Sequence, residues 1–449
     1  MLGPVQSRTF LQLAAGLCLA LAGSLASAQV AGEVEFARGV GFAQTPGQAP
    51  RTLGKGLELR EGDRLTTAEG SSAIVKLQDG TRMTVRPNSE IVLQQYQFRE
   101  NGSDNSMLLQ MVRGGFRAVT GLISKGSPNA ARVQTSTATI GIRGTDFDAR
   151  LCTRDCGAES AQVAESARPN AVLASAKVVQ SAGELYAVDA NNQRRRLVDG
   201  GSVYPGDVVE TMPGARAVLA FRDDSRISLG SNTRFRVDNF VFDEKNAAEG
   251  RFLVSLVRGT VRAITGLIGK ANNRNVSFST STATIGIRGT ELGIGCEPDC
   301  SNLNLWTFLG AIAVQQTGQS ALELLQAGQG LFISPSGVVP ISTPQQQLTS
   351  PDVVPPGDVP VPPNTFSTQQ VSDAQEGLFV FVRDGHIEVA TASQVLHLGK
   401  GEAGFANSAG DTARPTNIPK FIDFDKLPLP TARNPLLVSV LSDVPRVCK

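Results

Sequence analysis

The sequence predicts an all-β protein made of two tandem short-stranded β domains, each a sandwich or a short β-solenoid, plus a small C-terminal β element. Three observations predict it: a long internal repeat, strand-like alternation inside each copy, and the composition of the chain. Glycine (46) and proline (24) are plentiful, whereas tryptophan (1), histidine (2) and tyrosine (3) are scarce. Many turns between short strands fit this profile better than long helices do.

The internal repeat decides the architecture. Residues 135–145 (TSTATIGIRGT) recur without a change at 280–290, which is 145 positions later. Two shorter matches precede it, namely Gly62-Asp63 with Gly206-Asp207 and Val112-Arg113-Gly114 with Val257-Arg258-Gly259. The register slips by a single residue near Asn101-Gly102, where a hairpin turn is expected. A surface turn tolerates such a change, so the chain contains a duplicated β domain.

Within each copy, short alternating segments flank tight turns. Ser72–Leu77 is expected to be a strand whose side chains alternate between two sides, and it is followed by an Asp79-Gly80 turn and a returning strand. The second copy repeats this order with Ala217–Phe221, Asp223-Asp224 and Ile227–Leu229. Neither copy sustains a helical period, so both are expected to consist of strands.

Changes in composition, together with turn-forming and proline-rich stretches, divide the chain into seven segments. A Pro-rich stretch cannot bury a core, and we expect it to act as an extended, semi-rigid spacer. The segment after it echoes the strands that close the second domain, and so predicts a partial third repeat. The expected boundaries are 1–28 (signal peptide), 29–152 (domain 1), 153–171 (linker), 172–334 (domain 2), 335–371 (Pro-rich linker), 372–407 (C-terminal partial β repeat) and 408–449 (Pro-broken tail).

The first residues are typical of an export signal. One positive charge, Arg8, precedes an apolar stretch, and Ala26-Ser27-Ala28 supplies the small residues of a cleavage site before Gln29. No later stretch reaches the roughly 18 apolar residues of a membrane span. We therefore expect a periplasmic or secreted protein, cleaved near Ala28, with no retained transmembrane span.

The charge balance argues against nucleic acid as a partner. The signal carries one arginine and no acid, so its removal leaves 41 basic and 41 acidic residues. Nucleic-acid binders usually carry a basic excess or a basic stripe. We expect no nucleic-acid partner.

The ordered motifs resemble the periplasmic domain of the FecR family. Its elements are a Gly-Asp followed by Thr, a strand–turn–strand hairpin, and a closing Arg-Gly-Thr strand. Here they are Gly62-Asp63 with Thr66, Asp79-Gly80, and Arg143-Gly144-Thr145; the second copy has Gly206-Asp207 with Thr211, Asp223-Asp224, and Arg288-Gly289-Thr290. The resemblance covers about 100 residues in each copy, and its double occurrence makes the ordered set specific.

The resemblance implies a regulatory role outside the cytoplasm. Regulators of this family span the inner membrane: a cytoplasmic segment acts on a sigma factor, and the periplasmic part receives a signal from an outer-membrane receptor. This chain has a cleavable signal in place of the cytoplasmic segment, which argues against direct sigma-factor regulation. The resemblance therefore implies for this chain the role of the family's exported part. That role is recognition of an envelope protein (a membrane sensor or an outer-membrane protein) or of an unknown ligand.

The candidate binding residues lie in the Arg-Gly-Thr motif. A guanidinium with five donors beside a glycine can anchor an anionic ligand or a partner's carboxylate. Alternatively, it satisfies backbone carbonyls where the following glycine bends the strand. We favour the structural role because buried arginine is usually paired. The candidate set is Arg143, Thr145, Arg288 and Thr290.

One cysteine pair follows the Arg-Gly-Thr strand in each copy: Cys152 with Cys156 in the first and Cys296 with Cys300 in the second. In an exported protein, such spacing favours local disulfides. A structural zinc site requires four ligands, and no histidine lies near either pair in the sequence. We therefore predict disulfides and no metal site, with Cys448 left unpaired.

Acid–base candidates for catalysis are few. The two histidines, His386 and His397, both lie in the C-terminal element, where they could face each other, although exposure on a surface hairpin is the simpler expectation. Without a histidine, neither repeat has a nucleophile–histidine set. We expect a non-enzymatic protein without a cofactor that binds a partner or ligand in envelope signalling; the alternative is a structural scaffold or adhesin-like protein.

Overall fold

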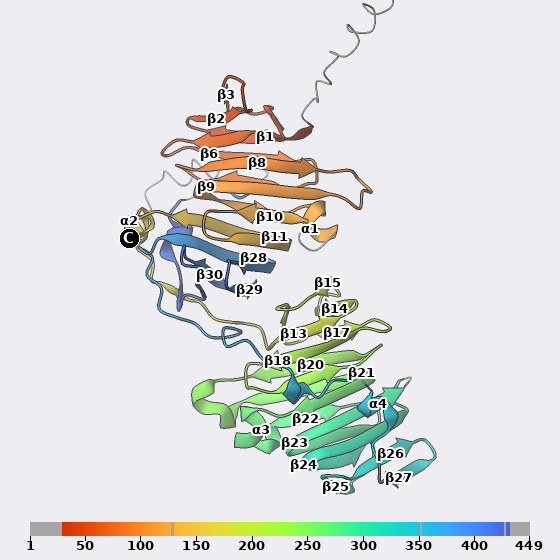
Figure 1. The fold of residues 1–449 in the computed structure, drawn as a ribbon. Helices are drawn as coiled ribbons and strands as arrows, with labels where there is room; N and C mark the ends of the chain where they lie inside the picture. The colour runs from red at the N-terminus through yellow and green to blue at the C-terminus, as the bar shows by residue number, and fades with distance from the viewer. Residues whose placement is uncertain (1–28, 127–129, 298, 351–352, 426–427, 432–449) are drawn as a thin grey trace, which may run out of the picture.

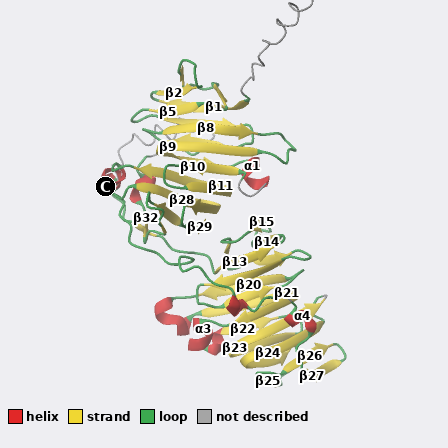
Figure 2. Ribbon diagram, in the orientation of Figure 1, coloured by secondary structure: helices red, strands yellow, loops and turns green. Residues whose placement is uncertain are grey.

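The protein forms two stacks of β-strands joined end to end (Figures 1 and 2). The structure is a computed structural model that describes residues 29–431 apart from 127–129, 298, 351–352 and 426–427. Each stack is a single sheet of fifteen strands, which confirms the all-β prediction. The expected signal peptide and Cys448 lie outside the described residues.

The first stack contains strands from two distant parts of the sequence. They are β1 Val30–Arg38, β2 Gly41–Gln44, β3 Arg51–Thr52, β4 Glu58–Arg60, β5 Arg64–Thr67, β6 Ser72–Leu77, β7 Arg82–Val85, β8 Glu90–Gln97, β9 Ser106–Val119, β10 Ala131–Gln134, β11 Thr139–Cys152, β28 Gly377–Ala390, β29 Val395–Gly399, β30 Ala403–Ala406 and β31 Thr412–Ala413. Helix α1 (Leu122–Gly126) connects β9 to β10.

The second stack is continuous in sequence. Its strands are β13 Ala176–Ala182, β14 Leu185–Val188, β15 Arg194–Leu197, β16 Ser202–Val203, β17 Val208–Thr211, β18 Arg216–Phe221, β19 Arg226–Leu229, β20 Arg234–Val241, β21 Arg251–Ile264, β22 Val276–Ser279, β23 Ala283–Glu297, β24 Asn302–Gln316, β25 Leu322–Gln326, β26 Gly330–Ser334 and β27 Gly337–Ile341. The short helices η1 (Glu244–Glu249), α3 (Leu267–Ala271) and η2 (Asn273–Asn275) lie in its connections.

The sheet of each stack folds over on itself, so that its two faces enclose one hydrophobic core. Long strands bend from one face to the other. In β11, residues Thr139–Ile142 pair with β10, whereas those from Asp146 onward pair with β9. The bend falls at Gly144, whose φ of 58° is readily adopted only by glycine, and β28 bends beside it at Gly385 with a φ of 91°. The glycine of the Arg-Gly-Thr motif thus allows one strand to belong to both faces of the stack.

The C-terminal element closes the first stack. Strand β28 pairs antiparallel with β11 along both of its segments, as β24 pairs with β23 in the second stack. The segment expected at 372–407 as a partial β repeat therefore lies in the first sheet, where β28 takes the position that β24 has in the second. Its likeness to the closing strands of the second domain is genuine, but an unpaired β11 edge offers backbone groups that this segment satisfies.

The Pro-rich segment 335–371 is not a free spacer. After β27, its helices α4 (Gln346–Thr349) and η3 (Pro356–Asp358) follow the second stack, and Leu348 and Val353 are buried. The Ser228 hydroxyl donates a hydrogen bond to the Val354 carbonyl over 2.5 Å. Scattered apolar side chains and backbone carbonyls of a proline-rich chain are thus enough to hold it against a folded domain.

The segments expected to be a linker and a tail also pack together. Helix α2 (Cys156–Gln162) and strand β12 (Arg168–Pro169) follow β11, and β12 pairs with β32 (Asn417–Ile418). Helix η4 (Lys420–Asp423) places Phe421 in a small core with the Cys152–Cys156 disulfide and Phe379. Across the described part of the chain, none of the helices has the length and apolar character that a membrane crossing requires.

A buried charge cluster joins the two stacks. The Lys177 Nζ atom of the second stack lies 2.9 Å from Glu402 Oε2 of the first, and Arg414 Nε lies 2.6 Å from the same oxygen. All three side chains are at most 2% exposed. Lys177 Nζ and Arg414 Nη2 also donate to the His397 carbonyl, over 3.0 and 2.5 Å. The charge of Lys177 is therefore compensated only while the two stacks stay together.

Replacing the shared carboxylate tests the importance of this cluster. We expect Glu402→Gln to lower the free energy of unfolding by about 3 kcal/mol, because two buried cations then lose their counter-charge. Urea unfolding of the mature protein measures the change. The control is Glu376→Gln, which breaks the exposed Arg154 pair and should cost less than about 1 kcal/mol. Equal effects of the two substitutions would contradict the assigned role.

A second substitution tests the packing of the C-terminal segment. Because Phe421 is fully buried, Phe421→Ala should lower the free energy of unfolding by about 3 kcal/mol. Leu429, which is 45% exposed, provides the control, and Leu429→Ala should change stability by less than about 1 kcal/mol. Thermal or urea unfolding distinguishes the two. An unperturbed Phe421→Ala protein would mean that this segment does not pack in solution.

Candidate functional site: a basic cleft between the stacks

A cleft of about 510 Å³ lies where the end of the first stack approaches the beginning of the second. Helix α1 and the bend of β11 line one side, and β15 with its flanking residues lines the other. Its lining residues are Ser124, Lys125, Gly126, Arg143, Gly144, Gln193, Arg194, Arg195, Arg196 and Val198. Five of these ten side chains are cationic, so the cleft is strongly basic.

Arg143 reaches the cleft because of its place in β11. The alternating Ile140 and Ile142 point into the core, so Arg143 points away from it, one residue before the Gly144 bend. Its guanidinium is 20% exposed and lies 3.5 Å from Glu388 of β28. The Arg143 Nε atom is buried without a hydrogen-bond partner among the described residues.

On the opposite side, two arginines of β15 are held by their neighbours. Arg194 stacks 3.7 Å from the centroid of the Tyr186 ring, and Glu210 lies 3.7 Å from its Nε. Arg195 pairs with Asp207 and donates to the Ser202 carbonyl over 3.0 Å. Asp207 belongs to the repeated Gly-Asp motif, whose first copy likewise pairs Asp63 with Arg51. The motif therefore holds an arginine in both stacks.

Lys125 and Arg196 complete the positive lining. Both side chains are exposed, and neither forms a hydrogen bond or an ion pair with any residue that the structure describes. The carboxylates that pair with the other cations of the lining are Glu388, Asp207 and Glu210. The cleft therefore has an excess of two positive charges over its paired carboxylates.

The two histidines lie beneath the cleft at the junction. His397 Nδ1 is 3.4 Å from His386 Nε2, which confirms that the two residues face each other. Both are half-buried, so the expectation of an exposed hairpin position is wrong. Burial, together with Lys177 and Arg143, lowers the pKa of His397 to about 4, and burial lowers the pKa of His386 well below its usual range. The pair is therefore neutral at physiological pH.

The buried cluster beside the histidines has shifted acidities as well. Burial lowers the pKa of Lys177 to about 8, against the opposing attraction of Glu402. Burial alone would raise the pKa of Glu402, but Lys177 and Arg414 outweigh it and lower that pKa. Lys177 and Glu402 are thus oppositely charged near neutral pH, and with Arg414 the cluster carries one net positive charge.

The other predicted binding residues have structural contacts. The Thr145 hydroxyl donates to the His386 carbonyl over 3.0 Å, and the Thr290 hydroxyl donates to the Ala311 carbonyl over 2.8 Å. Each threonine therefore fastens the bend of its strand to the next strand. Arg288 occupies the same position of β23 that Arg143 has in β11, and the strand register places it opposite Ala311 of β24. Among the predicted residues whose side chains the structure describes, only Arg143 lines the cleft.

Sequence reasoning missed the residues from the second stack and from α1. The run Arg194-Arg195-Arg196, which follows the Asn191-Asn192 turn, is a local concentration of charge that could have indicated a basic hairpin. Nothing local to Lys125 or Arg143 indicates that this hairpin lies opposite them. Their convergence depends on the docking of the stacks.

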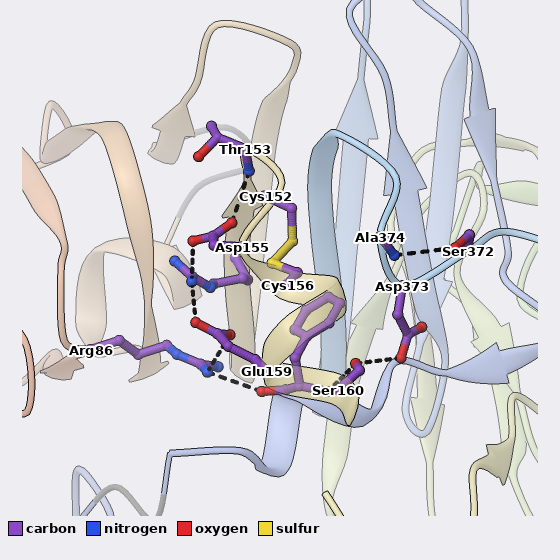
Figure 3. The surroundings of a disulfide bond; sticks show 12 residues. Arg86, Cys152, Thr153, Asp155, Cys156, Glu159, Ser160, Ser372, Asp373 and Ala374 are labelled. Carbon is purple, nitrogen blue, oxygen red and sulfur yellow. Dashed lines mark hydrogen bonds and ion pairs between the residues drawn. A yellow bond between two sulfur atoms is a disulfide. The ribbon is translucent and has the colours of Figure 1, made fainter. Parts of the chain in front are cut away.

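The predicted disulfides are present, and Figure 3 shows the surroundings of the first. Cys152, at the end of β11, bonds to Cys156 at the start of α2, and Cys296 bonds to Cys300. Beside the first bond, Arg150 Nη2 lies 2.6 Å from Asp155 and 2.5 Å from Glu159. The sulfur atoms are shared in disulfides, so they are not thiolate ligands for a metal.

Comparisons with known proteins identify the repeated unit. The model of the family described as FecR protein matches residues 63–167 and 207–312. No curated protein matches the chain. Among solved structures, two crystal structures of a "putative anti-sigma factor" from Parabacteroides distasonis are similar, with 14% identity and a TM-score of 0.26. The match covers 32% of this chain and 62% of that protein.

The two family matches agree with the two stacks. Each match begins at the aspartate of a repeated Gly-Asp motif, Asp63 or Asp207, and continues beyond the Arg-Gly-Thr bend of the same stack. The chain therefore carries two FecR domains in tandem, one in each stack.

Proposed function

We propose that this chain is an exported, non-enzymatic regulatory protein that binds a partner in the cell envelope through the cleft between its FecR domains. The observation that carries the proposal is the convergence of Arg143 and the β15 arginines across the junction. The FecR family supports a regulatory role. The locked orientation of the stacks supports a preformed site, which binds without a large ordering cost.

The disulfides support a location outside the cytoplasm, in the periplasm or beyond it. Disulfides persist in oxidising compartments, and each stack contains one in the same place after its Arg-Gly-Thr strand. The export signal expected at residues 1–28 accords with this location.

The chemistry of the cleft favours binding over catalysis. Its charged lining consists of arginines and one lysine. Arginine stays protonated in proteins and cannot serve as a general base, whereas its donors suit the recognition of anionic groups. The neighbouring histidines contact each other and lie outside the lining.

The scaffold alternative loses its main support. It depended on an extended reach for the Pro-rich segment, but Arg226 donates to the Val359 carbonyl over 2.9 Å and Ser228 donates to Val354, so this segment lies along the second stack. A docked segment adds no reach. We therefore place the regulatory function first.

In-cell cross-linking followed by pull-down from the native envelope tests the proposal. We expect a membrane sensor or outer-membrane protein to be captured by the mature chain and lost with Arg143→Ala, because this arginine lines the cleft. Arg288→Ala is the matched control, since it changes the equivalent position of β23, a strand that contributes no residue to the cleft lining, and should retain the partner. Circular dichroism verifies that both variants fold. Equal capture by both variants, or equal loss, would contradict the assignment of the site.

A further inference from the structure

We infer that the cleft binds a compact anion carrying two or more phosphate or carboxylate groups. This inference rests on the proposed function, because it names the chemistry that the same site recognises. The cleft's volume of about 510 Å³ lies within the range of small-molecule sites. A long acidic polymer would need a groove that extends beyond these residues.

The unbalanced charge requires a ligand with more than one negative charge. Glu388, Asp207 and Glu210 accompany Arg143, Arg195 and Arg194. Lys125 and Arg196 have no ion-pair partner among the described residues, and they approach the cleft from different stacks. A ligand that neutralises both must therefore bridge the two domains with separate anionic groups.

The arginines are arranged before any ligand arrives. The Tyr186 ring supports Arg194, and Asp207 with the Ser202 carbonyl holds Arg195. Holding these long side chains in place reduces the conformational entropy that a ligand would otherwise cost on binding. Four of the five cations are arginines, whose planar forks pair with the two oxygens of a carboxylate or phosphate.

Arg143 offers a further donor. Its only ion pair is the 3.5 Å contact with Glu388, and its Nε has no hydrogen-bond partner among the described residues. A buried unpaired donor costs free energy unless a partner satisfies it. A water or an oxyanion in the cleft would supply that partner, and an oxyanion would also add charge attraction.

Calorimetric titration of the purified mature chain tests the inference, with tripolyphosphate and citrate as the two probes. Binding of tripolyphosphate alone would identify phosphate chemistry, and binding of citrate alone would identify carboxylate chemistry. Acetate, which has a single charge, should bind at least about tenfold more weakly than the better probe. Raising the salt concentration should also weaken binding, because exposed charges are screened.

The decisive variant reverses the two unpaired cations. Lys125→Glu/Arg196→Glu should weaken probe binding by at least about tenfold, and both side chains are exposed, so folding should be preserved. Lys245→Glu, on η1 outside the cleft, is the control and should leave probe binding within about twofold. Absence of binding to both probes, or equal weakening in the two variants, would overturn the inference. If the envelope partner is nevertheless captured in an Arg143-dependent way, the proposed function stands and only the ligand chemistry fails.

Discussion

The antiparallel pairing of β11 with β28 is the interaction on which the rest of the structure depends. It joins residues such as Thr145 and His386, which are 241 positions apart, and it makes the second stack an insertion between two strands of the first. A domain inserted in this way is tethered by two chain segments, and both segments pack against the folded stacks. The orientation of the two FecR domains is consequently restrained by covalent connection as well as by contact, which is the condition for a preformed cleft.

The buried charges at the junction add specificity to this restraint. Removing Lys177, Glu402 and Arg414 from water is costly, and their mutual attraction compensates only in one geometry. Apolar side chains would tolerate sliding of the stacks, whereas displaced buried charges would be left unpaired. In this protein, the hypothesis that buried charges specify orientation is attractive because the cleft lies beside them.

The duplicated strands show how one end of the fold became a junction. In β28 the residues Asp384, His386 and Glu388 face Asp146, Arg143 and Gly141, whereas the corresponding residues of β24 are Leu309, Ala311 and Ala313. The backbone arrangement is the same, but only the closing strand of the first stack, β28, carries ionisable groups at these positions. These groups therefore reflect differences between the copies, and the fold follows from their similarity.

The sequence by itself determined the duplication, the strands, the bend at Gly144 and the two disulfides, because these depend on local periodicity, turn chemistry and cysteine spacing. It also singled out Arg143. Only the tertiary structure decided that β28 completes the first stack, that the Pro-rich segment and Phe421 pack, and that Lys125 and Arg143 lie opposite Arg194, Arg195 and Arg196. Those outcomes depend on which distant surfaces satisfy one another's backbone groups, apolar area and charge, and such complementarity leaves no periodic signal in a single sequence.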